Sequence, residues 1–173
     1  MVGLGDWGLR KSDFILSPNK ILFIVIILKI LLKDTDMKHE ALTRKIIGCA
    51  MKVHNVLGNG FQEVIYQRAL AIEMERQGLS FRREMEMTIF YEGIDIGTRR
   101  VDFFVEDAIM LELKAVIALD DRALNQAMNY CQVYNLPIGL LINFGGNSLE
   151  FKRVYNVHHP ENKEYKKGSI KRT

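Results

Sequence analysis

The sequence predicts an α/β domain in which a mixed central β-sheet is flanked by α-helices. Two observations indicate this class. Apolar residues recur at helical spacing in the first part of the domain, and from residue 81 onward they follow the alternation and short apolar runs of strands, with one further helix between them. Hydrophobic residues make up 48% of the 173-residue chain, enough to bury the core of one such domain.

Residues 1–36 form an N-terminal extension without these periods. Within it, residues 21–32 are apolar except for Lys29, a run shorter than the roughly 20 residues that span a bilayer. Its flanks lack the basic start and the cleavage site of a secretory signal. Two interpretations stay open: an interfacial, membrane-surface or partner-binding segment, or a translated upstream region in which Met37 is the true start. We favour the second, because an amphipathic helix with its own start signals follows Met37 directly.

Two helices are expected at the start of the domain. Residues 39–57 carry apolar side chains at helical spacing, with basic residues off that stripe. Residues 58–60 (Gly-Asn-Gly) interrupt the pattern, and residues 61–77 resume it until Gly78 closes the second helix.

Strands are expected next. Residues 81–91 alternate charged and apolar side chains, which predicts a half-buried strand. After a turn, residues 94–98 and 100–105 read as extended segments, the second more buried. Residues 108–115 are mostly apolar on both faces, as in a central strand.

The last part of the domain is expected to be helix followed by strand. Asp120 occupies the N-cap position of a helix over residues 121–134. A buried strand over residues 138–143 follows, and residues 149–155 are expected to form an edge strand. We therefore predict one domain over residues 37–155.

The cysteines and the charge distribution set limits on the class of protein. Cys49 and Cys131 have no partner at metal-ligand spacing, which suits a reducing compartment and predicts a cytoplasmic protein without a catalytic thiol. The net charge of +3 is concentrated in residues 156–173, which we expect to be a flexible basic tail that holds nucleic acid nonspecifically. The basic residues at the end of this tail are Lys163, Lys166, Lys167, Lys171 and Arg172.

Charged residues occur where buried strands are expected. Glu112 and Lys114 are two positions apart on one strand and so share a face, while Leu113 enters the opposite layer. Asp102 is equally out of place in the strand before it. Burying an unpaired charge costs several kcal/mol, so either a mutual ion pair or a metal ion must compensate.

The turn between these two strands decides whether the carboxylates meet. A three-residue connection pairs Val105 with Ile109 and therefore places Asp102 opposite Glu112. A two-residue turn would pair Asp102 with Leu111 and put the carboxylates on opposite faces. A shared site therefore requires the longer turn or a bulge.

Two carboxylates on neighbouring strands suit Mg²⁺ or Mn²⁺, which prefer hard oxygen ligands. Such an ion makes a bound water more acidic, and the Lys114 ammonium would stabilise negative charge growing on a phosphate. This combination points to phosphodiester hydrolysis. The alternative is a buried structural ion cluster without chemistry.

The residues around these positions resemble a known family. The run VDFFVEDAIMLELKA resembles the D-x(n)-E-x-K signature of the PD-(D/E)XK nuclease superfamily. Gly60, Glu63 and Tyr66 match the pattern for which the GxxExxY family of that superfamily is named. The two matches stand in the right order and cover about residues 37–155. Val101 replaces the proline of the superfamily's name without removing a ligand.

The resemblance implies a restriction-endonuclease-like core and a Mg²⁺-dependent (or Mn²⁺-dependent) nuclease acting on DNA or RNA, with DNA favoured. It implies that Glu63 adds a carboxylate to the metal ligands Asp102 and Glu112. The Leu113 carbonyl would complete the coordination, and Lys114 would position the attacking water.

Other residues near these motifs have weaker assignments. Gln126 and Tyr130 resemble the Q-x-x-x-Y element with which some relatives line the site from the following helix, and their spacing puts them on one helical face. Tyr66 is expected to serve packing, and His54 is expected to be structural in the turn after the first helix. The alternative to an enzyme is a catalytically inactive module that binds nucleic acid or protein. The presence of all four proposed active-site residues favours the enzyme; these are Glu63, Asp102, Glu112 and Lys114.

Overall fold

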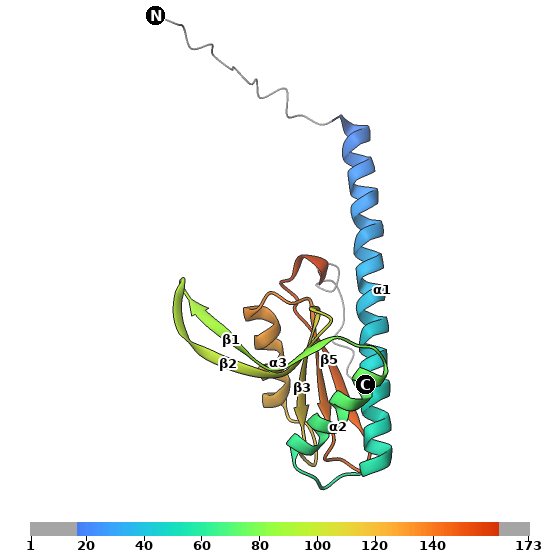
Figure 1. The fold of residues 1–173 in the computed structure, drawn as a ribbon. Helices are drawn as coiled ribbons and strands as arrows, with labels where there is room; N and C mark the ends of the chain where they lie inside the picture. Colours follow the sequence, from blue (N-terminus) through green and yellow to red (C-terminus); the bar gives the residue numbers. More distant parts are fainter. Residues whose placement is uncertain (1–16, 163–173) are drawn as a thin grey trace, which may run out of the picture. The chain divides into compact units, whose positions relative to one another are not determined.

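The computed structural model describes residues 17–162, without the side chains of residues 29 and 32–38 (Figure 1). The chain divides into two units, Met1–Thr35 and Asp36–Thr173. In chain order the elements are α1 (Pro18–Leu57), α2 (Glu63–Arg76), β1 (Phe81–Tyr91), β2 (Ile94–Val105), β3 (Ile109–Lys114), α3 (Asp121–Val133), β4 (Ile138–Asn143) and β5 (Glu150–Tyr155). This order confirms the predicted α/β class.

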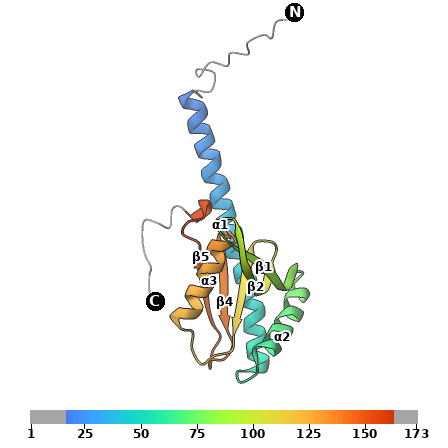
Figure 2. The same cartoon turned by 90° about the vertical axis from the view of Figure 1, so that its left-hand side faces the viewer.

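The five strands form one mixed sheet in the order β1-β2-β3-β4-β5. Neighbouring strands are antiparallel except β3 and β4, which run parallel because α3 carries the chain back between them. Helices cover both faces of the sheet (Figure 2). The side chains of α2 and of the second half of α1 pack in one core cluster, and those of α3 pack in the other.

The two faces alternate along the central strands with a period of two. On β3, Leu111 and Leu113 belong to the core beneath α1 and α2, whereas Met110 belongs to the core beneath α3. On β4, a Cβ at Gly139 would come within 2.7 Å of the Cys131 Sγ, so glycine allows α3 to pack closely on the sheet here.

Both cysteines are free and buried in these cores. Burial raises the pKa of the Cys49 thiol and raises the pKa of the Cys131 thiol to about 12. Both thiols therefore stay protonated at neutral pH. Burial and protonation both make a thiol a weaker nucleophile.

The first helix begins earlier than the sequence analysis expected. We predicted a start near residue 39, but α1 begins at Pro18. Ser17 accepts hydrogen bonds from the Ile21 N–H at its carbonyl (3.0 Å) and from the Lys20 N–H at its Oγ (3.4 Å). A serine N-cap followed by proline at the first helical position is a strong start signal, and the apolar residues beyond it are compatible with a helix.

The apolar run is therefore helical rather than irregular. All of its apolar side chains that the structure describes are at least 40% exposed. Within residues 17–162, no helix is long and apolar enough to cross a membrane.

The expected tail from residue 156 onward is partly packed. The Asn156 side chain donates to the Cys131 carbonyl (3.1 Å), and the Asn162 side chain donates to the Asn156 carbonyl (2.9 Å). His159 is 9% exposed. Residues 163–173, which include the basic residues named above, lie outside the described part of the chain.

The β1–β2 hairpin reaches beyond the rest of the sheet (Figure 1). The two extended segments expected over residues 94–98 and 100–105 form the single strand β2. Only Phe103–Val105 of β2 pair with β3, whereas the pairing of β2 with β1 extends from Ile94 to Val105, with interruptions at Ile96 and Asp102. The sheet therefore divides at Asp102, where β2 leaves β3.

Candidate active site

The register of β2 and β3 decides whether the carboxylates meet. Val105 pairs with Ile109 and Phe103 pairs with Leu111, which confirms the three-residue connection. In this register Asp102 lies opposite Glu112. The shared site that the sequence required is therefore geometrically allowed.

Asp102 occupies the end of the backbone ladder between these strands. The ladder stops at Phe103, and the Asp102 carboxylate takes over the next donor: its Oδ2 accepts from the Leu113 N–H at 2.7 Å. Its Oδ1 accepts from the Gln67 side chain of α2 at 3.2 Å. Burial raises the pKa of Asp102, although the Leu113 hydrogen bond and the nearby Lys114 oppose that shift.

The pairing with β1 is also irregular at Asp102. Arg83 pairs with Phe103, but Glu84, the next residue of β1 and the one opposite Asp102, has no partner in the register. Glu84 has a φ of 49°, in the left-handed region that is unfavourable for a residue with a long side chain. The pairing of β2 with β1 and its pairing with β3 are therefore both interrupted at Asp102.

Glu112 and Lys114 form an ion pair on β3. The Lys114 Nζ lies 2.8 Å from the Glu112 Oε1, and Glu112 is 7% exposed. Burial raises the pKa of Glu112, and the charges of Asp102 and Glu63 add to the rise while Lys114 opposes it. Burial alone would lower the pKa of Lys114, but Glu112 and the other carboxylates outweigh it and raise that pKa, so the lysine is protonated.

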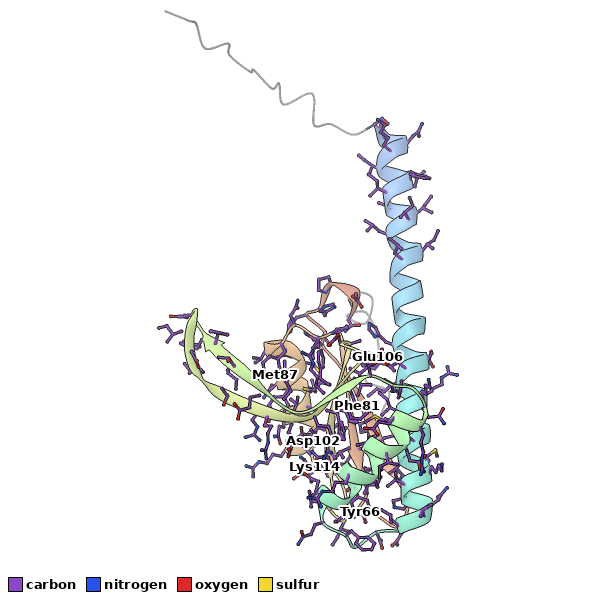
Figure 3. All side chains as sticks on the ribbon, viewed as in Figure 1. Tyr66, Phe81, Met87, Asp102, Glu106 and Lys114 are labelled. Carbon is purple, nitrogen blue, oxygen red and sulfur yellow. The ribbon has the colours of Figure 1, made fainter. Side chains whose placement is uncertain are left out.

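Glu63 is the first residue of α2 and is half-buried. Burial raises its pKa, Lys114 lowers it and Asp102 raises it again, so the three charges lie close together. Three carboxylates from α2, β2 and β3 therefore act electrostatically on one ammonium group, which is in direct contact with Glu112. Asp102 and Lys114 are labelled in Figure 3.

Tyr66 secures the loop that leads into α2. Its hydroxyl donates to the Gly58 carbonyl (2.9 Å) and accepts from the Phe61 N–H (3.2 Å). Its ring, labelled in Figure 3, stacks on Phe144 with centroids 4.6 Å apart. Tyr66 thus fixes the entry to the helix that begins at Glu63, and the prediction of a packing role is confirmed.

The side chain of His54 makes a structural contact, but with the loop after β4 rather than within the turn after the first helix, where the sequence analysis placed its role. Its Nε2 lies 3.1 Å from the Gly146 carbonyl oxygen, a contact that joins the end of α1 to the loop after β4. The glycine pair of this loop also has a packing reason, because a Cβ at Gly145 would come within 2.4 Å of the Val116 carbonyl.

Gln126 and Tyr130 lie together on α3, as their spacing predicted. The Gln126 amide donates to the Tyr130 hydroxyl at 2.6 Å. The Arg99 guanidinium of β2 also donates to that hydroxyl and lies over the ring, 5.6 Å from its centroid. Among the described residues, the hydrogen bonds of this pair lead to Arg99 and not to the three carboxylates.

Sequence reasoning missed Gln67, which is 6% exposed and hydrogen-bonded to Asp102. A signal for it existed. Gln67 lies four residues after Glu63 on the same helix, so both side chains point to the same side of α2. The sequence alone offered no partner for this glutamine, because its contact depends on how α2 packs against the sheet.

The donor chemistry of this site fits a hard divalent cation. Carboxylate oxygens are the preferred ligands of Mg²⁺ and Mn²⁺. Burial is the main cause of the raised pKa of Glu63 and of Glu112, and the charge of Asp102 adds to both rises. Among the residues that the structure describes, no three Asp, Glu, His or Cys side chains are already arranged as a metal cluster. The Lys114–Glu112 ion pair explains part of this, since a cation must compete with the ammonium for Glu112.

Comparison with known proteins identifies the class to which this fold and site belong. The model of the PD-(D/E)XK nuclease superfamily matches residues 40–154, so the chain belongs to that superfamily. Its sheet and helices are those of the restriction-endonuclease-like fold. Members of the superfamily are usually nucleases and generally use divalent metal ions.

Among solved structures, the chain is similar to the one titled "Crystal structure of SSO0001", with 14% identity and a TM-score of 0.41. The match covers 53% of this chain and 48% of that one, so it spans about half of that protein's length. Among curated proteins, no sequence matches significantly.

Proposed function

We propose that this chain is a nuclease that hydrolyses phosphodiester bonds of DNA, or of RNA, with the help of Mg²⁺ or Mn²⁺. One observation carries the proposal: the Lys114 Nζ lies 2.8 Å from the Glu112 carboxylate at the point where β2 separates from β3, and the charges of Glu63 and Asp102 also act on this lysine. Such an excess of buried negative charge destabilises the metal-free fold. A bound cation would relieve this repulsion.

Each residue has a role in this proposal. Glu63, Asp102 and Glu112 would hold the cation, with the Leu113 carbonyl as a further ligand. When bound, the cation supplies positive charge that lowers the pKa of water and offsets charge on the phosphate. Lys114 is protonated and within reach of Glu112, so its ammonium can orient the attacking water and stabilise the negative charge that develops on the phosphate.

We further propose that the chain is a GxxExxY-type member of the superfamily. The role of Tyr66 supports this, because it ties down the loop around Gly60 from which Glu63 emerges. The spacing of Gly60, Glu63 and Tyr66 thus has a physical reason in this chain. Gln126 and Tyr130 enter the proposal as residues that position the nucleic acid rather than as groups that touch the reacting atoms.

A second function is favoured by a different observation. The ion pair between Lys114 and Glu112 already satisfies part of the site without a metal. A module that has kept the fold but binds nucleic acid or protein without turnover would retain such a pair. Cleavage assays separate the two functions.

The direct test is digestion of duplex DNA, single-stranded DNA and structured RNA by the purified chain with Mg²⁺, with Mn²⁺ and with EDTA. We expect cleavage with either metal and none with EDTA. The Lys114→Ala variant, purified in the same way, controls for contaminating nucleases. Binding of nucleic acid without any cleavage would support the inactive module instead.

A further inference from the structure

A hydrogen-bonded chain leads from the protein surface to Asp102. The Arg83 Nη2 donates to the Gln67 Oε1 at 3.1 Å, and the Gln67 Nε2 donates to the Asp102 Oδ1 at 3.2 Å. We propose that Gln67 is a positioning residue that couples Arg83 to Asp102 and holds this carboxylate in the orientation in which it binds the cation. The inference rests on the proposed function and adds two residues to that site.

The direction of the glutamine amide follows from its neighbours. A guanidinium has only donors, so the Gln67 oxygen must face Arg83. The Gln67 NH₂ group is then left to face Asp102, whose ionised carboxylate has only acceptors. In this orientation of the amide both hydrogen bonds form. In the flipped orientation neither forms, because the NH₂ group would face Arg83 and the oxygen would face Asp102.

The second oxygen of Asp102 is also held. Its Oδ2 accepts from the Leu113 backbone N–H at 2.7 Å, and this donor cannot move without moving β3. An ionised carboxylate has about four lone-pair sites, so one hydrogen bond at each oxygen leaves acceptor capacity for a cation. The two hydrogen bonds therefore orient the carboxylate and leave lone pairs on it that can bind a cation. Hydrogen-bonded partners of this kind orient metal ligands in many sites.

Gln67 and Arg83 are held in place by different contacts. Gln67 is 6% exposed and lies on the same side of α2 as Glu63, so one helix face would supply a metal ligand and the support for another. Arg83 is exposed at the surface, but its guanidinium lies over the Phe103 ring, 5.8 Å from the centroid. Phe103 also pairs with Arg83 in the sheet.

A glutamine suits this position for an electrostatic reason. A carboxylate at residue 67 would bond Arg83 equally well, but it would have no hydrogen to donate to Asp102 and would add a like charge to the cluster. A lysine would bring a cation that competes with the metal. The neutral amide supplies a donor to Asp102 and leaves the charge of the cluster unchanged.

The test is a double-mutant cycle in the full chain, with Mn²⁺ affinity measured by calorimetry. Gln67→Met keeps the length of the side chain and removes both hydrogen bonds, and we expect Mn²⁺ to bind about 10- to 100-fold more weakly. Arg83→Met should have a smaller effect, which disappears in the Gln67→Met background because Arg83 acts through Gln67.

Arg82→Met is the matched control. Arg82 is the neighbouring exposed arginine of β1, lies over the Phe104 ring at 5.1 Å and pairs with Asp107, and has no hydrogen bond to Gln67. Its replacement should leave the Mn²⁺ affinity unchanged. Thermal unfolding of each variant shows that the chain remains folded.

A measurement on the metal-free chain tests the hydrogen bonds themselves. In ¹⁵N NMR spectra the Gln67 side-chain NH₂ protons should exchange slowly with water, and Arg83→Met should shift their resonance. Fast exchange, or equal Mn²⁺ affinity of a folded Gln67→Met variant and the wild type, would overturn the inference alone. Failure of the wild-type chain to bind Mn²⁺ would overturn the proposed function, and the positioning role would fall with it.

Discussion

Strands β3 and β4 lie side by side in the centre of the sheet and share almost the same surroundings. They run parallel and pair residue for residue from Ile109–Ile138 to Lys114–Asn143. Every residue of β4 is buried, and in β3 only Lys114 is partly exposed. Each strand nevertheless ends in a polar residue, and β3 also carries Glu112 where β4 has Leu141.

The polar residue of β4 is fully satisfied by its neighbours. The Asn143 Oδ1 accepts from the Val116 N–H (3.0 Å) and the Gly145 N–H (3.1 Å), and its Nδ2 donates to Glu150 (3.4 Å). The side chain is neutral, so no charge is left uncompensated. Asn143 thus joins the loops that follow β3 and β4, and its function is structural.

The polar residues of β3 are not balanced in this way. Glu112 and Lys114 compensate each other, but burial raises the pKa of Glu112, and the carboxylates of Asp102 and Glu63 add to that rise. The comparison teaches that a polar residue in a buried strand is not by itself a sign of function. An excess of like charge among such residues is a sign, because folding alone gains nothing from it.

The largest effect should follow from changing β3. Glu112→Gln keeps the shape of the side chain but removes a negative ligand, and Lys114→Ala removes the ammonium. Each should slow cleavage by at least about 100-fold, the scale of one electrostatic or acid–base group in such sites. Initial rates on the best substrate measure this.

Two charged residues of the outer strands serve as matched controls. Glu86→Gln in β1 and Lys152→Ala in β5 make related changes at exposed positions of the same sheet. Both should retain nearly full activity. Robust cleavage by Glu112→Gln and Lys114→Ala would place the chemistry elsewhere. The polar residues of β3 would then be structural, like Asn143 of β4.

The next largest effect should follow from changing β4. Asn143→Ala leaves the Val116 and Gly145 N–H groups without their acceptor, which should lower the free energy of unfolding by about 1–3 kcal/mol. Mn²⁺ affinity should persist as long as the chain is folded. Urea unfolding and calorimetry measure the two properties, and a metal-binding loss without a stability loss would contradict the structural role of Asn143.

A smaller effect concerns the pH dependence of stability without metal. Because Glu112 has a raised pKa in the fold, the folded chain binds more protons than the unfolded chain at pH values above 4.5, its ordinary pKa. The charge of Glu112 therefore destabilises the fold increasingly as the pH rises from 4.5 through the raised pKa of Glu112. In EDTA at pH 7, Glu112→Gln should therefore be more stable than the wild type.

This advantage should shrink on acidification towards pH 4.5, where the wild-type Glu112 also becomes protonated. Chemical unfolding of both proteins across this range measures the difference. A Glu112→Gln variant that is clearly less stable at pH 7 would mean that the ion pair with Lys114 outweighs the repulsion, as in a purely structural cluster.

The smallest effect is expected from the N-terminal extension. Because the described apolar side chains of residues 21–31 are at least 40% exposed, they contribute little to the core that holds β3 and β4. A chain that begins at Met37 should unfold within about 2 °C of the full chain. A loss of several degrees in Tm would show that the two strands depend on the extension.

Part of this site was predictable because strand period is a local property. The alternation of residues in β3 put Glu112 and Lys114 on one face. The sequence left the length of the turn open, and the register of the structure puts Asp102 opposite Glu112. The early start of α1 was missed because an all-apolar run has no amphipathic face, although Ser17 is a local start signal. The spacing of Gln67 from Glu63 put both on one side of α2, but the partners of Gln67 were not predictable, since they lie on β1 and β2.

Mn²⁺ calorimetry on the β3 variants tests the central claim most directly. The account predicts that Glu112→Gln binds Mn²⁺ at least about tenfold more weakly than the wild type, because a charged ligand is lost. Lys114→Ala should bind at least as tightly as the wild type, because Glu112 no longer has a competing ammonium, and yet it should fail to cleave. Unchanged Mn²⁺ affinity in a folded Glu112→Gln variant would contradict the assignment of β3 as the metal-binding strand.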